Sequence, residues 1–153
     1  MQATSGVVYC HSTFLDGWVQ IGIASGRVIS VSFPPDEPQS GATEHALLDR
    51  VREYLDEGAP VEFTDVEIAL TVDQTDRAIL DTVRTIPYGK RWTVEDVIDR
   101  TAILTDEDAA RSVRSAIGTN PVPLIIPDHR VDTDSSPIHP SIRIALRRRE
   151  GLT

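Results

Sequence analysis

The sequence has little sulfur and no long apolar run. Its 153 residues include one cysteine, Cys10, so we expect neither an internal disulfide nor a cysteine-based metal site. The longest apolar stretch, Val122 to Ile126, is far shorter than the roughly 20 residues of a membrane helix. Met1 to Gly6 lacks the basic and apolar stretches of a secretory signal. We therefore expect a cytoplasmic protein with no membrane partner.

Basic residues are scarce, and lysine is almost absent. The chain has 15 basic and 24 acidic residues, a net charge of -9, and Lys90 is its single lysine. This bias resembles halophile proteins, in which acidity serves solubility, and it argues against non-specific nucleic-acid binding. Residues 1–76 hold three arginines and thirteen acids, whereas residues 77–153 hold twelve basic and eleven acidic residues. The uneven distribution indicates two lobes with different tasks.

Residues 1–72 are expected to form a small α+β lobe. Apolar residues alternate from Trp18 to Ile23 and again from Ile29 to Phe33, which predicts a hairpin with its turn at Ser25-Gly26. Thr43 is the predicted cap of a helix with one apolar stripe. Residues 61–70 alternate again and predict one or two further strands. The sequence thus indicates a sheet covered by one helix.

Residues 73–153 are expected to form a helical domain. An apolar stripe predicts a first helix from about Asp73. Thr93 to Asp96 has the form of a capping box that opens a second helix, and Thr105 to Asp108 has the same form for a third helix, which ends at Gly118. The second and third helices are joined by a brief turn and make a helix-turn-helix candidate. The alternative is that this pair serves packing alone.

The predicted helix that ends at Gly118 bears arginines, serines and small alanines, so its surface can approach a duplex closely. Acidic residues 106–108 at its N-terminus would instead repel DNA. In the other interpretation these acids stabilise the helix dipole, and Arg111 pairs with Asp108 three residues earlier. The candidate DNA-binding residues on this helix are Arg111, Ser112, Arg114 and Ser115.

The most specific segment runs from Asn120 to Val131 and reads NPVPLIIPDHRV. A buried apolar strand, bounded by prolines, is expected to present an acid, an imidazole and a guanidinium side by side, as at a functional site. With IPYG at residues 86–89 and AARSVRSAIGTNP at 109–121, this segment resembles the C-terminal domain of the methylated-DNA-protein-cysteine alkyltransferases, whose signature is PCHRV after NP. The resemblance covers residues 75–151 and implies a winged helix-turn-helix-like core after a smaller sheet lobe.

The resemblance implies repair of O6-alkylguanine in double-stranded DNA. In that family a helix-turn-helix enters the minor groove, an arginine fills the gap left by the flipped base, and a cysteine takes the alkyl group. By position, Arg111 would be that arginine, Asn120 would brace the pocket, and Arg130 would anchor the strand. His129 and Glu150 occupy the positions whose relay activates the thiol.

Asp128 stands at the position of the acceptor cysteine. Alkyl transfer needs a soft thiolate, and a carboxylate is a much weaker nucleophile. The Asp128 carboxylate could accept hydrogen bonds from a guanine edge, although its charge would repel the DNA backbone. Two further departures are Val94 in place of the family's tyrosine, and Asp132 to Pro140 in place of a glycine- and tyrosine-rich loop. Cysteine-free relatives, the alkyltransferase-like proteins, bind alkylated DNA and pass it to excision repair.

The sequence leaves three hypotheses. The first is a monomer that binds alkylated DNA without accepting the alkyl group and hands it to excision-repair proteins. The second is an active methyltransferase with an unconventional acceptor, Asp128 or Cys10. The third is a structural or interaction domain that has lost DNA binding and keeps residues 128–130 as an ion-pair and hydrogen-bond cluster. No cofactor is expected, and the isolated histidines do not indicate a metal site.

Overall fold

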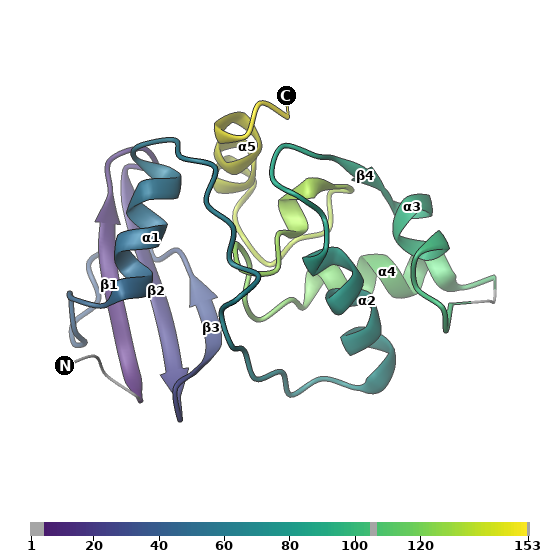
Figure 1. The fold of residues 1–153 in the computed structure, drawn as a ribbon, viewed down its shortest axis with the longest axis horizontal. Coiled ribbons are helices and arrows are strands. Elements are labelled where there is room, and N and C mark those ends of the chain that lie inside the picture. The colour runs from purple at the N-terminus through teal and green to yellow at the C-terminus, as the bar shows by residue number, and fades with distance from the viewer. Residues whose placement is uncertain (1–4, 105–106, 153) are drawn as a thin grey trace. The chain divides into compact units, whose positions relative to one another are not determined.

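The computed structural model describes residues 5–104 and 107–152 of the chain (Figure 1). The chain divides into two compact units, Met1–Ala69 and Leu70–Thr153. The first unit contains an antiparallel sheet and one helix, and the second is mainly helical, so the predicted α+β class is confirmed. Within the described residues, no helix is long and apolar enough to cross a membrane.

The first unit is built on a sheet of strand order β1-β2-β3. Its strands are β1 (Gly6–Ser12), β2 (Gly17–Ala24) and β3 (Arg27–Ser32). β2 and β3 form the predicted hairpin, whose turn residues Ser25 and Gly26 have φ values of 51° and 76°. Left-handed conformations at both central positions suit the twist of a two-residue hairpin.

Helix α1 (Ala46–Leu55) packs against β1 and follows the predicted apolar stripe. Its N-cap is His45, not Thr43 as predicted. Nδ1 of His45 accepts a hydrogen bond from the backbone N–H of Leu47 at 3.0 Å, so an imidazole nitrogen satisfies the free helix donor that a hydroxyl was expected to satisfy. The buried residues of α1 are Leu47, Leu48, Val51, Tyr54 and Leu55.

Residues 61–70 do not form the predicted strands. Ile68 makes an isolated bridge to Val28, whose backbone bonds to the residues on either side of Ile68. The earlier part of the segment is held by α1 instead, because Arg50 pairs with Asp65 at 2.8 Å and also donates to the carbonyl of Glu62. The alternation thus belongs to an extended segment with one bridge to the sheet.

The second unit gathers its helices around one apolar core. Helix α2 (Gln74–Arg84) begins after the N-cap Asp73. Helix α3 (Val94–Asp99) begins with the predicted capping box, in which Thr93 and Asp96 exchange hydrogen bonds of 2.9 and 3.1 Å. The buried apolar residues of this core include Ile79, Leu80, Val83, Val97, Val113, Ile117, Val122, Ile126 and Leu146.

Helix α4 (Ala109–Gly118) contacts both α2 and α3. It ends where the sequence predicts, but its N-cap residue Asp108 makes no side-chain capping hydrogen bond. The predicted cap Thr105 and its neighbour Asp106 lie outside the described residues.

The remaining elements surround the specific motif. A single turn, η1 (Asp128–Arg130), leads into β5 (Val131–Asp132), which pairs in parallel with β4 (Trp92–Thr93). Helix α5 (Pro140–Arg149) then packs on η1, which also contacts α2. The acid, the imidazole and the guanidinium of the motif are therefore enclosed by helices of the second unit.

Candidate functional site

The apolar run before the motif is buried but irregular. It was expected to be a strand, yet Ile126 only turns back to donate a hydrogen bond to the carbonyl of Val122 at 2.9 Å. Leu124 has a φ of 80°, a conformation that is uncommon for a residue with a side chain. The prolines at 121, 123 and 127 have no N–H to donate to a strand neighbour, which explains why no regular strand forms. The turn delivers Asp128 into the interior.

Asp128 is fully buried, with a relative exposure of 0%. Its Oδ2 accepts a hydrogen bond from Nδ2 of Asn120 at 3.0 Å, and its Oδ1 lies 3.4 Å from the hydroxyl of Ser136. Burial raises the pKa of Asp128 from 3.8 to about 6, although the Asn120 hydrogen bond and the charge of Arg143 on α5 lower it in part. A neutral carboxylic acid is therefore accessible close to physiological pH.

Asn120 ties the acceptor position to the turn that precedes it. Besides Asp128, its Nδ2 donates to the carbonyl of Ile126 at 3.0 Å, and its Oδ1 accepts from the backbone N–H of Val122 at 3.0 Å. Both amide hydrogens and the amide oxygen are thus used. The bracing role that the resemblance implies for Asn120 stays a prediction, and these contacts are compatible with it.

His129, Arg130 and Glu150 form a second buried cluster beside Asp128. Glu150 accepts hydrogen bonds from Nε2 of His129 at 2.6 Å and from Nε of Arg130 at 2.8 Å. The same carboxylate accepts from the backbone N–H of Gly89 at 3.0 Å, and Arg130 also donates to the carbonyl of Ile86 at 2.6 Å. The IPYG turn therefore packs on the cluster through its backbone.

The electrostatics of this cluster favour a neutral histidine. Burial lowers the pKa of His129, and the opposing effect of Glu150 does not overcome it. Burial also raises the pKa of Glu150, but the hydrogen bonds from His129 and Arg130 outweigh it and hold that pKa at about 2. Arg130 is thus the cation that compensates the carboxylate, and His129 donates its Nε2 hydrogen, leaving Nδ1 as an acceptor.

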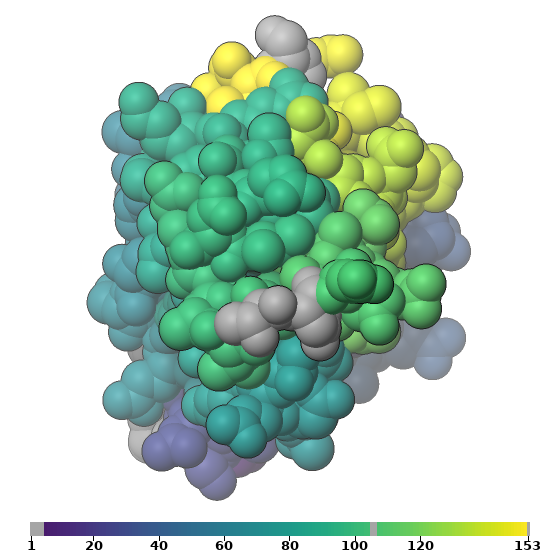
Figure 2. All heavy atoms as spheres, turned by 90° about the vertical axis from the view of Figure 1, so that its right-hand side faces the viewer, coloured from purple at the N-terminus to yellow at the C-terminus, as the bar shows by residue number. Residues whose placement is uncertain are grey.

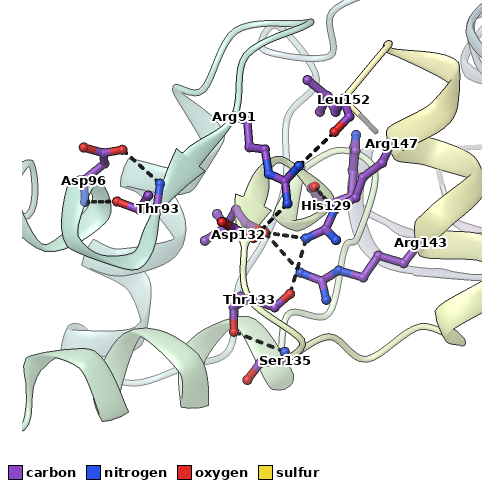
Figure 3. A network of polar contacts seen from close by, with 11 residues as sticks. Arg91, Thr93, Asp96, His129, Asp132, Thr133, Ser135, Arg143, Arg147 and Leu152 are labelled. Carbon is purple, nitrogen blue, oxygen red and sulfur yellow. Dashed lines mark hydrogen bonds and ion pairs between the residues drawn. The ribbon is translucent and has the colours of Figure 1, made fainter.

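Two arginines of α5, which sequence reasoning did not select, hold the chain that follows Asp128 (Figure 3). Arg147 donates to the carbonyls of His129, Val131 and Thr133 at 2.9, 2.7 and 3.3 Å, and Arg143 donates to that of Val131 at 3.2 Å. Their spacing of four residues was a signal that they share a helix face. The pair fixes the backbone from His129 to Thr133.

A third arginine, directly before β4, extends the same network. Arg91 pairs with Asp132 at 2.8 Å and donates to the carbonyl of Leu152 at 2.9 Å (Figure 3). This contact joins the parallel strand pair to the residues after α5.

The four candidate residues of α4 lie apart from the buried clusters, on the outside of the helix. Arg111, Arg114 and Ser115 are exposed, and Ser112 is half-buried. The Arg111 side chain is 83% exposed and lies 4.0 Å from Asp108, a separation and an exposure at which an ion pair contributes little. In Figure 2 this green part of the chain and the yellow-green residues near 131–140 share one face of the second unit.

Solved structures show which class of protein has this fold. The Mycobacterium tuberculosis O6-methylguanine methyltransferase superposes with a TM-score of 0.71 at 23% identity, covering 94% of this chain and 91% of that one. The structure of Mycobacterium tuberculosis OGT in complex with DNA gives a TM-score of 0.67 at 24% identity, covering 85% and 80%. The chain therefore has the fold of the O6-methylguanine methyltransferases.

The family follows from the sequence comparisons. The family model described as the 6-O-methylguanine DNA methyltransferase, DNA binding domain, matches residues 74–150. The chain belongs to this family. The methylated-DNA–protein-cysteine methyltransferase of Methanopyrus kandleri is 34% identical over 89 residues, which are 58% of this chain and 63% of that protein. The one from Mycobacterium tuberculosis is 31% identical over 109 residues, 69% and 62%. The matches thus span less than two thirds of these relatives.

Proposed function

We propose that this chain binds double-stranded DNA, recognises O6-alkylated guanine and does not take the alkyl group. The observation that carries this proposal is a carboxyl group, Asp128, at the acceptor position of a motif whose other polar residues are bonded together. His129, Arg130 and Glu150 keep a buried network, whereas the sulfur that irreversible transfer requires is missing. A carboxylate that is buried and bonded to an amide is a poor nucleophile toward a saturated carbon.

Cys10 does not supply the missing thiolate. It lies in β1 of the first unit with a relative exposure of 4%. Burial is the largest influence on its pKa and raises it, so the thiol stays protonated and unreactive at neutral pH. This favours the binding function over the hypothesis of an alternative acceptor.

DNA contact is assigned to α3 and α4, which pack on each other and would act as the helix-turn-helix. Arg111 is the residue that would enter the duplex, because its side chain extends from α4 into solvent. We place the protein in the cytoplasm as a monomer that holds a lesion for excision-repair proteins. Its acidic, lysine-poor composition suits a high-salt interior, where phosphate contacts weaken.

The test compares matched duplexes that differ by a single O6-methylguanine, titrated by fluorescence anisotropy over a range of salt. We expect tighter binding to the modified duplex and loss of that binding in Arg111→Ala. Arg77→Ala is the matched control, since Arg77 is an exposed arginine on α2 and its loss changes the net charge equally. Equal affinity for both duplexes would remove the recognition claim, and no binding at any salt would favour an interaction domain.

Intact-protein mass spectrometry tests the second half of the proposal. Incubation of the chain with an equal amount of methylated duplex should leave its mass unchanged. A stoichiometric gain of one methyl group would show that the chain is an active methyltransferase. Asp128→Cys is the informative companion variant, because it restores the family's PCHRV motif within the same network.

A further inference from the structure

We infer that Asp128 recognises the alkylated base as a neutral carboxylic acid, which donates a hydrogen bond from Oδ1 to the acceptor edge of O6-alkylguanine. This inference rests on the proposed function, which places the alkylated oxygen of the base opposite position 128. It makes Asp128 a specificity-determining residue instead of a failed nucleophile. The ligand class is a purine whose facing edge carries acceptors only.

The geometry decides which oxygen carries the proton. Nδ2 of Asn120 donates to Oδ2 at 3.0 Å, and Asn120 is itself fixed by Ile126 and Val122. Oδ2 is therefore held as an acceptor, and the proton of the neutral acid belongs on Oδ1. The partner of Oδ1 is the hydroxyl of Ser136, 3.4 Å away on a half-buried residue. A hydroxyl can donate or accept, so it suits both charge states, and a ligand acceptor can replace this long contact.

The chemistry of the base then distinguishes the two charge states of Asp128. Alkylation at O6 removes the hydrogen from N1, so O6, N1 and N7 of the lesion are all acceptors. An ionised carboxylate also only accepts hydrogen bonds and would face these atoms without any donor. Unmodified guanine keeps its N1 hydrogen, which a carboxylate can accept. The neutral acid thus favours the lesion, and the ionised form favours the undamaged base.

The surroundings of Asp128 keep the neutral form within reach. Among the described residues, the side chain of Asp128 hydrogen-bonds to no carboxylate and to no cation, and its partners are the amide of Asn120 and the hydroxyl of Ser136. Arg143 and Arg147 on α5 attract its charge from a distance, but both are engaged by backbone carbonyls. The adjacent His129 is committed to Glu150, whose charge Arg130 compensates.

The experiment measures the ratio of dissociation constants for guanine and O6-methylguanine duplexes between about pH 7.5 and about pH 5. If only the neutral acid binds the lesion, the pKa of about 6 predicts that the preference for the lesion rises about 30-fold over this range. Asp128→Asn should show a high preference at every pH, because its amide always donates. Asp134→Asn, an exposed carboxylate of the nearby segment, should retain the pH dependence of the parent.

Asp128→Leu separates hydrogen-bond donation from simple loss of charge. Leucine has the same branched shape, is somewhat larger, and removes the charge but offers no donor, so its lesion preference should stay below that of Asp128→Asn throughout. Equal preferences for the leucine and asparagine variants would overturn the inference, as would a pH-independent preference in the parent protein. Failure of the proposed function looks different, since no protein of the series would then prefer the modified duplex at any pH.

Discussion

Replacing Asp128 by asparagine should stabilise the folded protein at neutral pH. The pKa of this carboxyl rises from 3.8 to about 6 on folding because burial disfavours the charged form. The unfolded chain therefore ionises first as the pH rises, and stability is lost between these two values. With 1.36 kcal/mol for each pKa unit, the penalty at about pH 7.5 amounts to about 3 kcal/mol. Asparagine keeps the shape and the hydrogen bond to Asn120 without the charge.

The assay is urea unfolding followed by the fluorescence of Trp92, in a Trp18→Phe background that leaves a single tryptophan in the second unit. The stability difference between Asp128→Asn and its parent should grow by about 2 kcal/mol between about pH 4 and about pH 7.5. Asp134→Asn, at an exposed position, should show no such growth. A difference that stays constant across this range would refute the reasoning, because it would mean that the buried carboxyl has an ordinary pKa.

Other predictions concern the groups around the motif. The pKa of Glu150 is lowered from 4.5 to about 2 in the folded protein, so the unfolded chain binds the proton first and stability of the parent should fall as the pH drops between these values. Glu150→Gln, measured by acid and urea titration, should lose this dependence and about 3 kcal/mol at neutral pH. Thr93→Ala removes half of a capping box and should cost about 1 kcal/mol in thermal or urea unfolding; an unchanged midpoint would contradict the capping role. Arg147→Lys places all donors on one atom, whereas Arg147 reaches the carbonyl of His129 from Nε and those of Val131 and Thr133 from another nitrogen. Hydrogen exchange of the amides after residue 129 should therefore accelerate, and unaltered exchange would show that Arg147 does not fix this segment.

Local signals in the sequence predicted several elements of the fold correctly. The alternation around Ser25-Gly26 predicted the β2–β3 hairpin, and the Thr93 and Asp96 pair predicted the start of α3, because both depend on neighbouring residues alone. β1 was not predicted from the sequence. This strand is defined by its antiparallel pairing with β2. The predicted strands at 61–70 failed for a related reason: their alternation does not reveal that Arg50 holds part of this segment to a helix.

The candidate site was predicted unevenly. The run of Asp128, His129 and Arg130 is visible in the sequence, but its link to Glu150 came only from the resemblance, because 20 residues separate Arg130 from that carboxylate. The roles of Arg143 and Arg147 were not predicted. Their spacing places them on one face of α5, yet nothing in the sequence says that backbone carbonyls would meet that face. Contacts between side chains and distant backbone groups leave no local pattern to read.

The hydrogen bonds of His129, Arg130, Glu150 and Arg147 do not involve the side chain of residue 128. Glu150 accepts hydrogen bonds from His129, Arg130 and the IPYG turn, and Arg147 holds the backbone beyond them. Within the described part of the chain, the side chain of Asp128 bonds only to Asn120 and Ser136. We therefore expect that residue 128 can be substituted while the surrounding hydrogen bonds are retained. If the proposed function holds, the residue at position 128 determines whether a molecule is used up in one encounter with a lesion or dissociates unchanged.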